Sequence, residues 1–273
     1  MPFTLSHLAV ALPFARSRWL VPSAVAAAAL APDVSMYVPW LRGFAPHSLT
    51  HHWVSTWYTA LPLAFAMLLA WRLLVRPVLI EWSPRMLAER LPPTWGSAWA
   101  DGWFDLWGGR EATMWARVRA ATGMFLGLII GIVTHILLDQ LTHWQGWGRV
   151  LLNWNGTHWG VYPVSTWVHI AISLLGLVAL AGVGVWLLLR RPIATELDRV
   201  VPRWIVRNVW GIAFVWLVAR YSMVLSQVPG QRMDHWLPDL INELIVTLSW
   251  LFVAVSVSSL VVLLWRGVKG KYH

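Results

Sequence analysis

Residues 120–141 read AATGMFLGLIIGIVTHILLDQL, a run that is apolar except near its end. As an α-helix, which rises about 1.5 Å per residue, this run is long enough to cross the roughly 30 Å hydrocarbon core of a bilayer. His135 and Asp139 interrupt it at a spacing of four, so their side chains lie on one face of the helix. Because ionisable groups are costly inside a membrane, this pair indicates a functional site.

Four further apolar runs have a similar length. They cover residues 54–75, 164–189, 204–225 and 243–265. The 273 residues are 58% hydrophobic and 12% charged, whereas soluble domains carry about 25% charged residues. The sequence therefore predicts an all-α polytopic membrane protein, a single membrane domain over residues 1–273 with about five transmembrane helices.

The N-terminal segment 1–53 has a different pattern. Its apolar stretches 3–15 and 20–31 are too short to span a membrane, and prolines punctuate them. We expect these two stretches to form a re-entrant helical hairpin, followed by a histidine motif.

The distribution of Lys and Arg predicts the orientation of the chain. Seven Arg lie in 72–119, five in 190–207 and three basic residues in 266–273, whereas 142–163 and 226–242 hold one each. Positive charge accumulates on the cytoplasmic side of membrane proteins. We therefore expect a multi-pass protein with the loop 76–117 and the C-terminus in the cytoplasm and the loop 142–163 outside.

Charge and composition also exclude several functions. The net charge of +9 sits mostly in loops between apolar runs, which indicates the lipid bilayer as a partner and no nucleic acid. Since the chain has no cysteine, any metal must be held by His, carboxylate and water. No Gly-x-Ser-x-Gly elbow or phosphate-binding Gly-Lys-Ser/Thr loop occurs, so a serine hydrolase or P-loop enzyme is unsupported.

The histidine motifs converge on one predicted membrane face. Counted from Arg119, His135 lies about 24 Å and Asp139 about 30 Å along the helix, near its outer end. The motif His47-Ser-Leu-Thr-His51 repeats the spacing of four just before the first apolar run, also at its outer end. Because the charge counts did not use these residues, the agreement supports a site at the extracytoplasmic face.

Each motif also has a structural explanation without a metal. His135 and Asp139 could form a polar helix end at the interface, and His47 with His51 a polar entry to the first run. His143 lies two turns beyond His135, too far to share its ion through an unbroken helix. Either the helix ends near Leu141 and the chain bends back, or His143 serves a second ion.

Other polar residues give weaker signals. Asp33 follows a proline and could be a helix cap, and His7 could be a buried structural histidine. Arg220 could snorkel to the interface or pair with Glu243. The remaining candidates on the outer side are His158, His169 and His235.

The chain resembles a family of bacterial multi-spanning membrane proteins of unknown function whose N-terminus reads like Met1-Pro-Phe-Thr-Leu-Ser-His7. The likeness covers most of residues 1–160 and continues through Ala31-Pro-Asp33, His47-Ser-Leu-Thr-His51 and His135-Ile-Leu-Leu-Asp139-Gln-Leu-Thr-His143. The family is similar to the YdjM-like membrane-bound metal-dependent hydrolases, which share a His-x-x-x-Asp and a Thr-His-Ser element. Here His52 stands where Ser is usual.

The resemblance implies a metal site at the outer face of a bacterial inner membrane. Zinc is the expected ion, because His and carboxylate suit it and sulfur is absent. Asp33 and Asp139 are also the acidic residues available for catalysis, and Thr50 and Thr134 could orient ligands. The expected ligands, enough for one or two ions, are His7, Asp33, His47, His51, His135, Asp139 and His143.

The expected function is hydrolysis of a phosphoester or ester bond in a lipid or membrane-associated substrate, since metal pairs activate water and stabilise phosphoryl transition states. Two other classes stay open. A non-catalytic metal-binding or scaffold protein would have a closed coordination shell. A transporter would need polar residues along several spans, whereas 164–189 and 243–265 are nearly all apolar between their ends.

Overall fold

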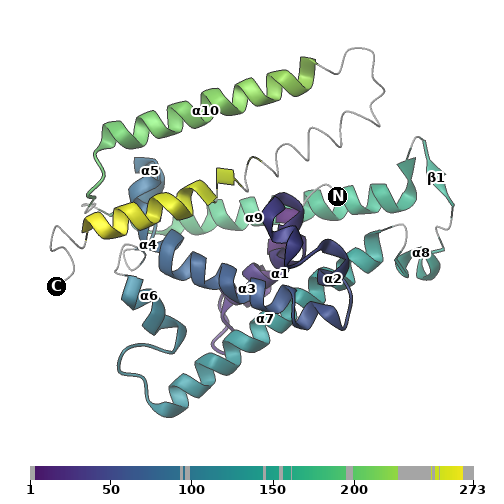
Figure 1. Cartoon of the computed structure of the whole chain (residues 1–273), viewed down its shortest axis with the longest axis horizontal. Helices are drawn as coiled ribbons and strands as arrows, with labels where there is room; N and C mark the ends of the chain where they lie inside the picture. The colour runs from purple at the N-terminus through teal and green to yellow at the C-terminus, as the bar shows by residue number, and fades with distance from the viewer. Residues whose placement is uncertain are drawn as a thin grey trace.

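The computed structural model describes residues 4–92, 95, 99–143, 146–153, 156–160, 162–194, 199–226, 247, 250–251 and 253–266. They are mostly helical (Figure 1). The elements in chain order are the 3₁₀-helix η1 (Thr4–Phe14), α1 (Pro22–Tyr37), the 3₁₀-helix η2 (Pro39–Gly43), α2 (His47–Thr50), the 3₁₀-helix η3 (Ser55–Trp57), α3 (Ala60–Leu69), the π-helix η4 (Ala70–Val75), α4 (Arg76–Trp82), α5 (Arg85–Ala88), α6 (Trp99–Leu106), α7 (Met114–Thr142), α8 (Gly148–Leu151), the antiparallel strands β1 (His158–Trp159) and β2 (Tyr162–Pro163), α9 (Val164–Arg190), α10 (Arg203–Ser226) and a final helix Val253–Arg266.

Three helical stretches are long and apolar enough to cross a membrane, namely Ser55–Trp82, Met114–Thr142 and Val164–Arg190. They contain the first three predicted runs. α10 forms where the fourth run was expected but is not one of the three, and most of the described part of the fifth run belongs to the shorter helix Val253–Arg266. Five spans and the side of each loop therefore stay predictions.

The first membrane-length stretch continues seven residues beyond its predicted end at residue 75, and the arginines near this point have partners within the protein. Arg72 Nε donates to Ser23 Oγ at 3.1 Å, and Arg76 Nη2 donates to Asp105 Oδ2 at 3.0 Å. The segment predicted as the loop 76–117 accordingly begins with α4 and also contains α5 and α6.

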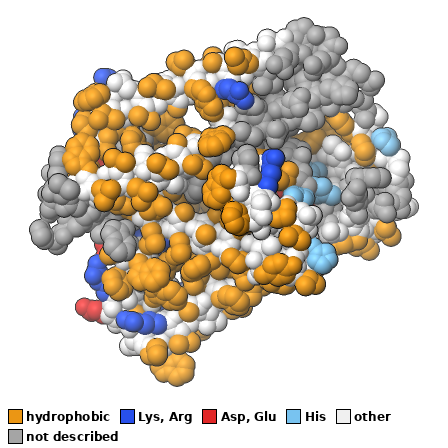
Figure 2. All heavy atoms as spheres, in the orientation of Figure 1, with side chains coloured by type: hydrophobic (Ala, Val, Ile, Leu, Met, Phe, Trp, Pro, Cys, Tyr) orange, Lys and Arg blue, Asp and Glu red, His pale blue; other side chains and the backbone are white. Residues whose placement is uncertain are grey.

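Hydrophobic side chains cover much of the surface in Figure 2. On α9, Leu175 and Val178 are 69% and 68% exposed, and on α10 Ile212 is 70% exposed. Soluble monomers rarely expose large contiguous apolar patches. This surface fits contact with lipid, as three helices of membrane-spanning length require.

The helices η1 and α1 occupy the two short apolar stretches at the N-terminus and pack against each other. Pro22 stands at the start of α1, where its missing N–H group costs no helical hydrogen bond. That this pair is re-entrant in a membrane stays a prediction.

Small residues bring the backbones of α1 and α7 into close contact. Gly123, Gly127 and Gly131 recur every four residues along α7. A Cβ atom on Gly131 would lie 2.4 Å from the Val25 carbonyl oxygen and 2.6 Å from Ala28 Cβ, so a larger residue would displace the helix. Small residues at this spacing are typical of helix pairs that pack within membranes.

The glycine stripe continues into the polar residues of α7. His135 and Asp139 follow Gly131 at further steps of four, so the same side of α7 carries them toward α1. Leu68 of α3 and Ile132 of α7 are fully buried beside this contact. The packing therefore holds the polar end of α7 against the C-terminal end of α1.

The long helix α9 connects two distant regions of the molecule (Figure 1). Near its start, His169 Nδ1 lies 3.2 Å from Thr142 Oγ1 at the end of α7. Near its end, Leu188 packs against a cluster that contains Ile80 of α4 and Ala88 of α5. His169 and Leu188 are separated by about 29 Å along the helix axis.

Candidate metal centre

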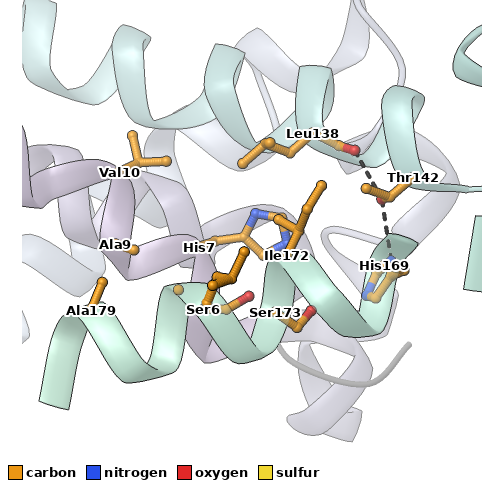
Figure 3. A pocket seen from close by; sticks show the side chains of 12 residues that line it. Ser6, His7, Ala9, Val10, Leu138, Thr142, His169, Ile172, Ser173 and Ala179 are labelled. Carbon is orange, nitrogen blue, oxygen red and sulfur yellow. Dashed lines mark hydrogen bonds between the residues drawn. The ribbon is translucent and has the colours of Figure 1, made fainter. Parts of the chain in front are cut away.

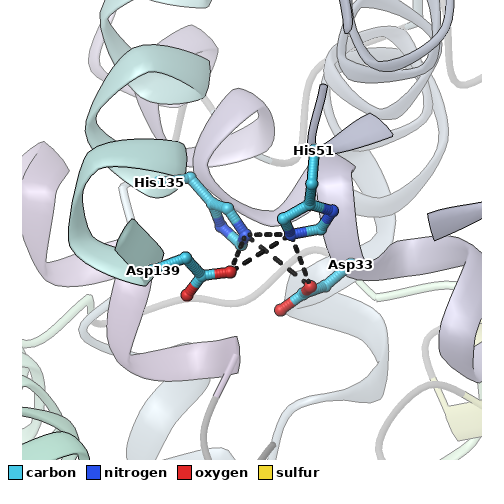
Figure 4. A group of neighbouring side chains, drawn as sticks. All are labelled: Asp33, His51, His135 and Asp139. Carbon is cyan, nitrogen blue, oxygen red and sulfur yellow. Dashed lines mark hydrogen bonds and ion pairs between the residues drawn. The ribbon is translucent and has the colours of Figure 1, made fainter. Parts of the chain in front are cut away.

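Four side chains converge where the ends of α1 and α7 meet the residue that follows α2 (Figure 4). Asp33 comes from α1, His51 caps α2, and His135 and Asp139 come from α7. One donor atom from each lies within 4.8 Å of all the others, and this group could hold a metal ion. We call these four residues the donor centre.

Five separations within the donor centre lie between 3.1 and 3.6 Å. His51 Nε2 lies 3.1 Å from His135 Nε2, 3.2 Å from Asp139 Oδ2 and 3.3 Å from Asp33 Oδ1. His135 Nε2 lies 3.5 Å from Asp139 Oδ2 and 3.6 Å from Asp33 Oδ1. Bonds of about 2.0–2.2 Å to a tetrahedral zinc ion place donors about 3.3–3.6 Å apart. The five distances therefore fit a first-row divalent metal.

The second nitrogen of each imidazole is already engaged. His135 Nδ1 donates to the Ala29 carbonyl oxygen at 2.7 Å, since a carbonyl can only accept. His51 Nδ1 lies 3.2 Å from the His47 carbonyl oxygen and 3.1 Å from Thr50 Oγ1. With the proton on Nδ1, a neutral imidazole turns the lone pair of Nε2 toward the donor centre, as metal-ligating histidines do.

In the described part of the chain, the carboxylates of the donor centre face histidines and no Lys or Arg side chain. Asp33 Oδ1 and Asp139 Oδ2 are buried and have no hydrogen-bond partner. Across the described ranges, neither carboxylate pairs with a Lys or Arg side chain. Buried charges are costly unless they are paired or coordinate a metal. A divalent cation would neutralise two carboxylates, so charge as well as distance favours one.

The other oxygen of Asp33 is fixed by η1 and α1. Thr4 Oγ1 donates to Asp33 Oδ2 at 2.7 Å, and the Tyr37 hydroxyl donates to Thr4 Oγ1 at 2.9 Å. Burial raises the pKa of Tyr37 to about 12, so this donor keeps its proton. Asp33 Oδ2 is therefore held in one orientation by the Thr4 hydroxyl group.

The three other predicted ligands contact the carboxylates from outside the donor centre. His7 Nε2 lies 3.7 Å and His143 Nδ1 3.5 Å from Asp139 Oδ1. His47 Nε2 lies 3.9 Å from Asp33 Oδ1. The structure thus brings all seven predicted residues into one group, in which four share a centre and three surround it.

The end of α7 decides the position of His143. The helix ends at Thr142, one residue after the end expected near Leu141, and His143 is its C-cap. His143 Nδ1 donates to the Asp139 carbonyl oxygen at 3.0 Å. This nitrogen therefore carries a proton and is not free to ligate the ion of the donor centre.

The other histidines that were named from the sequence and that the structure describes are not part of the donor centre. His52 is exposed, which agrees with the choice of His51 as the ligand. His158 is exposed and bonds to the Gly156 carbonyl oxygen, outside the group. His169 contacts His143 edge-on, with ring centroids 5.1 Å apart. His235 and Glu243 lie outside the described residues.

The residues that orient the ligands were predicted only in part. Thr50 does contact His51, and it also donates to the Pro32 carbonyl oxygen at 2.7 Å. Thr134 does not contact a ligand, because its hydroxyl donates to the Ile130 carbonyl oxygen of its own helix. Thr4 was missed, although it lies one 3₁₀ turn before His7 on the same helix.

The fold and the donor centre define a helical protein with three helices of membrane-spanning length and a His–Asp group that could hold a metal ion. The chain belongs to the family described as "Domain of unknown function (DUF4184)", which matches residues 1–260. No curated protein and no solved structure matches the chain. The family match includes every residue of the donor centre and assigns it no activity.

Proposed function

We propose that the protein is a membrane-bound, metal-dependent hydrolase that cleaves a phosphoester or ester bond in a lipid or membrane-associated substrate. The carrying observation is the donor centre itself, in which two imidazole nitrogens and two uncompensated carboxylate oxygens face one another. A divalent ion held there, zinc by its preference for this donor set, would polarise a water molecule and a phosphoryl or carbonyl oxygen. The likeness to the YdjM-like hydrolases supports the same reaction class.

His47 favours a metal centre with an open coordination position over one with a closed coordination shell. Its side chain is 38% exposed, whereas that of Asp33 is only 4% exposed. Its Nε2 atom faces Asp33 Oδ1 and is buried without a hydrogen-bond partner. His47 therefore offers a further donor atom beside Asp33, on a side chain that is partly exposed, and this atom can bind a second ion or a substrate oxygen.

The two carboxylates have different surroundings, which gives them different roles in this proposal. Asp33 directs Oδ1 to the donor centre and has Oδ2 occupied by Thr4, so it serves as a ligand. Asp139 directs Oδ2 to the donor centre, while its Oδ1 faces His7 and His143. Asp139 Oδ1 is thus the carboxylate oxygen that can accept a hydrogen bond from a water molecule.

An apolar pocket beside the donor centre supports a lipid-like substrate (Figure 3). It has a volume of about 300 Å³ and is lined by η1, α7 and α9, with Val10, Leu138 and Ile172 among its walls. His7 lines the pocket and stacks on His135 with ring centroids 4.2 Å apart. An apolar chain in this pocket would therefore bring its attached polar group close to the metal ligands.

A non-catalytic metal-binding protein is the second candidate. It is favoured by the observation that the donor centre already supplies four protein ligands, as structural zinc sites do. A transporter has less support. Between His169 and Arg190, Ser173 is the only residue of α9 with a hydroxyl group, so this helix offers few polar groups for a path.

The proposal is tested with metal-loaded protein in bilayers and a panel of phospho- and carboxyl-ester lipids. We expect turnover that a chelator abolishes and that His47→Ala abolishes while one equivalent of metal is retained. His52→Ala is the matched control, because His52 is adjacent but exposed, and it should keep full activity.

The closed-shell alternative has its own signature. Protein loaded with Co²⁺ should change its visible spectrum on addition of phosphate if a coordination position is open. Absence of turnover on the whole panel together with an unchanged Co²⁺ spectrum would reject the hydrolase and leave the non-catalytic metal site.

A further inference from the structure

A second pocket, of about 600 Å³, lies between the start of α10 and the segment that joins α4 to α5. Its arginines are Arg85, Arg199, Arg203 and Arg207. Trp210 also lines it, with the indole nitrogen donating to the Trp82 carbonyl oxygen at 2.7 Å. Among the residues that the structure describes, no acidic side chain lines this pocket.

The arginines on α10 are not neutralised by described residues. Arg203 and Arg207 are exposed and have no ion-pair partner in the described part of the chain. They lie four residues apart, so both guanidinium groups project from one face of the helix. Like charges at this spacing destabilise a helix. An anion between them would remove that repulsion.

The other two arginines of the pocket differ in the partners that they have. Arg85 pairs with Glu89. Arg199 Nη2 donates to the Ser83 carbonyl oxygen at 2.8 Å, but its Nε atom is buried without a hydrogen-bond partner. A buried N–H group without an acceptor is costly, and an anionic oxygen in the pocket would supply the acceptor.

Sequence neighbours do not remove the positive charge. Residues 190–207 contain five arginines against two acidic residues, Glu196 and Asp198, which lie outside the described residues. The net charge of this stretch is therefore +3, from five positive and two negative side chains.

The floor of the pocket is held in place by packing and by hydrogen bonds. Val201 and Val206 are 4% and 5% exposed and pack with Val78 and Val262. The backbone nitrogen of Val201 also donates to the buried carboxylate of Glu81 at 3.1 Å. The arginines thus stand on a fixed base, which lowers the entropic cost of ordering them around a ligand.

We infer that this pocket binds a phosphate-bearing anion, supplied either by a phospholipid headgroup or by a soluble phosphate. Guanidinium groups form paired, charge-assisted hydrogen bonds to phosphate oxygens. The N-terminal end of α10, whose Arg203 lines the pocket, favours the same charge. Trp210 and Val206 add an apolar wall that suits a ligand with a hydrocarbon part.

The pocket is independent of the donor centre. Ser83 and Arg85 lie beside the cluster at the end of α9, whereas the donor centre lies near its start. Basic pockets next to apolar helices are suited to anionic headgroups. Loss of metal or of hydrolysis would therefore leave anion binding unchanged.

The test uses the full chain in lipid nanodiscs of phosphatidylcholine with added phosphatidylglycerol, and native mass spectrometry of the lipids that stay bound. We expect the wild type to retain phosphatidylglycerol preferentially. The double variant Arg203→Gln, Arg207→Gln should retain at least about tenfold less, because each lost bond to a charged group is worth 1.5 kcal/mol or more. The matched control is Arg117→Gln, Arg119→Gln, which removes the same charge from exposed positions on α7.

A titration with inorganic phosphate separates the two sources. Displacement of phosphatidylglycerol at millimolar phosphate identifies a soluble ligand, and retention identifies the headgroup; both support the pocket. Equal retention by the wild type and the Arg203–Arg207 variant overturns the inference, and so does an equal loss in the Arg117–Arg119 control. Circular dichroism of each variant verifies that the helices are intact.

Discussion

Buried carboxylates occur in two regions of the protein, and the two regions differ in the hydrogen-bond partners that they give these groups. Glu81 is fully buried, accepts hydrogen bonds from the Val200 and Val201 backbone nitrogens at 3.1 Å each, and pairs with Arg266. Asp33 and Asp139 each leave one buried oxygen with no hydrogen-bond partner. Glu81 with these three partners, which we call the Glu81 cluster, has its charge and hydrogen bonds satisfied by protein groups alone. The donor centre does not.

This difference distinguishes a charge that protein groups complete from one that a metal ion could complete. A buried carboxylate with a guanidinium and two amides needs nothing from outside. Two buried carboxylates facing two imidazole nitrogens could hold a cation, since the distances between their donor atoms leave room for one. Incomplete hydrogen bonding at a well-packed position therefore marks the site better than burial or charge alone.

The largest expected effect concerns the two sides of the membrane. The regions lie at opposite ends of α9, so we expect them on opposite sides if α9 spans. A reporter fused after Gly148 should read extracytoplasmic and a C-terminal reporter cytoplasmic, because basic residues collect on the inner side. The result is all or none, measured with a phosphatase reporter that is active only outside. Two reporters on the same side would refute the five-span topology.

The next effect is loss of metal from the donor centre. Purified wild-type protein should hold one to two equivalents of a transition metal. His135→Ala and Asp139→Ala should each lose most of it, because each substitution removes one buried ligand of the four in the donor centre. Elemental analysis gives the occupancy. His158→Ala is the control, since His158 is exposed outside the group. Equal occupancy in all four proteins would contradict a metal centre at this position.

The Glu81 cluster should affect stability without involving a metal. Glu81→Gln removes the carboxylate that pairs with the buried Arg266 guanidinium, which should lower the free energy of unfolding by about 3–5 kcal/mol. Glu89→Gln, which removes a pair with the exposed Arg85, should cost no more than about 1 kcal/mol. Denaturant unfolding in detergent, with and without chelator, measures both. A chelator that removed the effect of Glu81→Gln would mean that the two regions are not separate.

The smallest effect is expected from the residue that orients His51. Thr50→Val removes the hydroxyl beside His51 Nδ1 and keeps the shape of the side chain. Such partners typically contribute about 10–100-fold to metal affinity. Competition with a chromogenic chelator measures the affinity. Thr134→Val should change nothing, because the Thr134 hydroxyl bonds only within α7.

The local part of the site could be predicted from sequence, because it depends on helical spacing. His135 and Asp139, and likewise His47 and His51, are four residues apart, and the structure brings both pairs to one place. Asp33 entered only through a family resemblance. No local pattern indicates that the end of α1 meets the end of α7, since packing between distant segments decides it.

A packing signal was nevertheless present in the sequence. Gly123, Gly127 and Gly131 have the same spacing of four as the ligands, and they explain why α1 approaches α7 so closely. The Glu81–Arg266 pair joins residues 185 positions apart, which no spacing rule reveals. The first run was predicted to end at residue 75, but the helix continues to Trp82, and Arg72 and Arg76 have tertiary partners.

The glycine stripe of α7 has a consequence for how the protein is made. Asp33 leaves the ribosome long before His135, so a nascent chain that ends before α7 holds only part of the donor centre. His135 finds the Ala29 carbonyl oxygen only when Gly131 has docked against Val25 and Ala28. Capture of an ion would therefore follow the docking of α7 against α1 and would record that these two helices have met in the correct register.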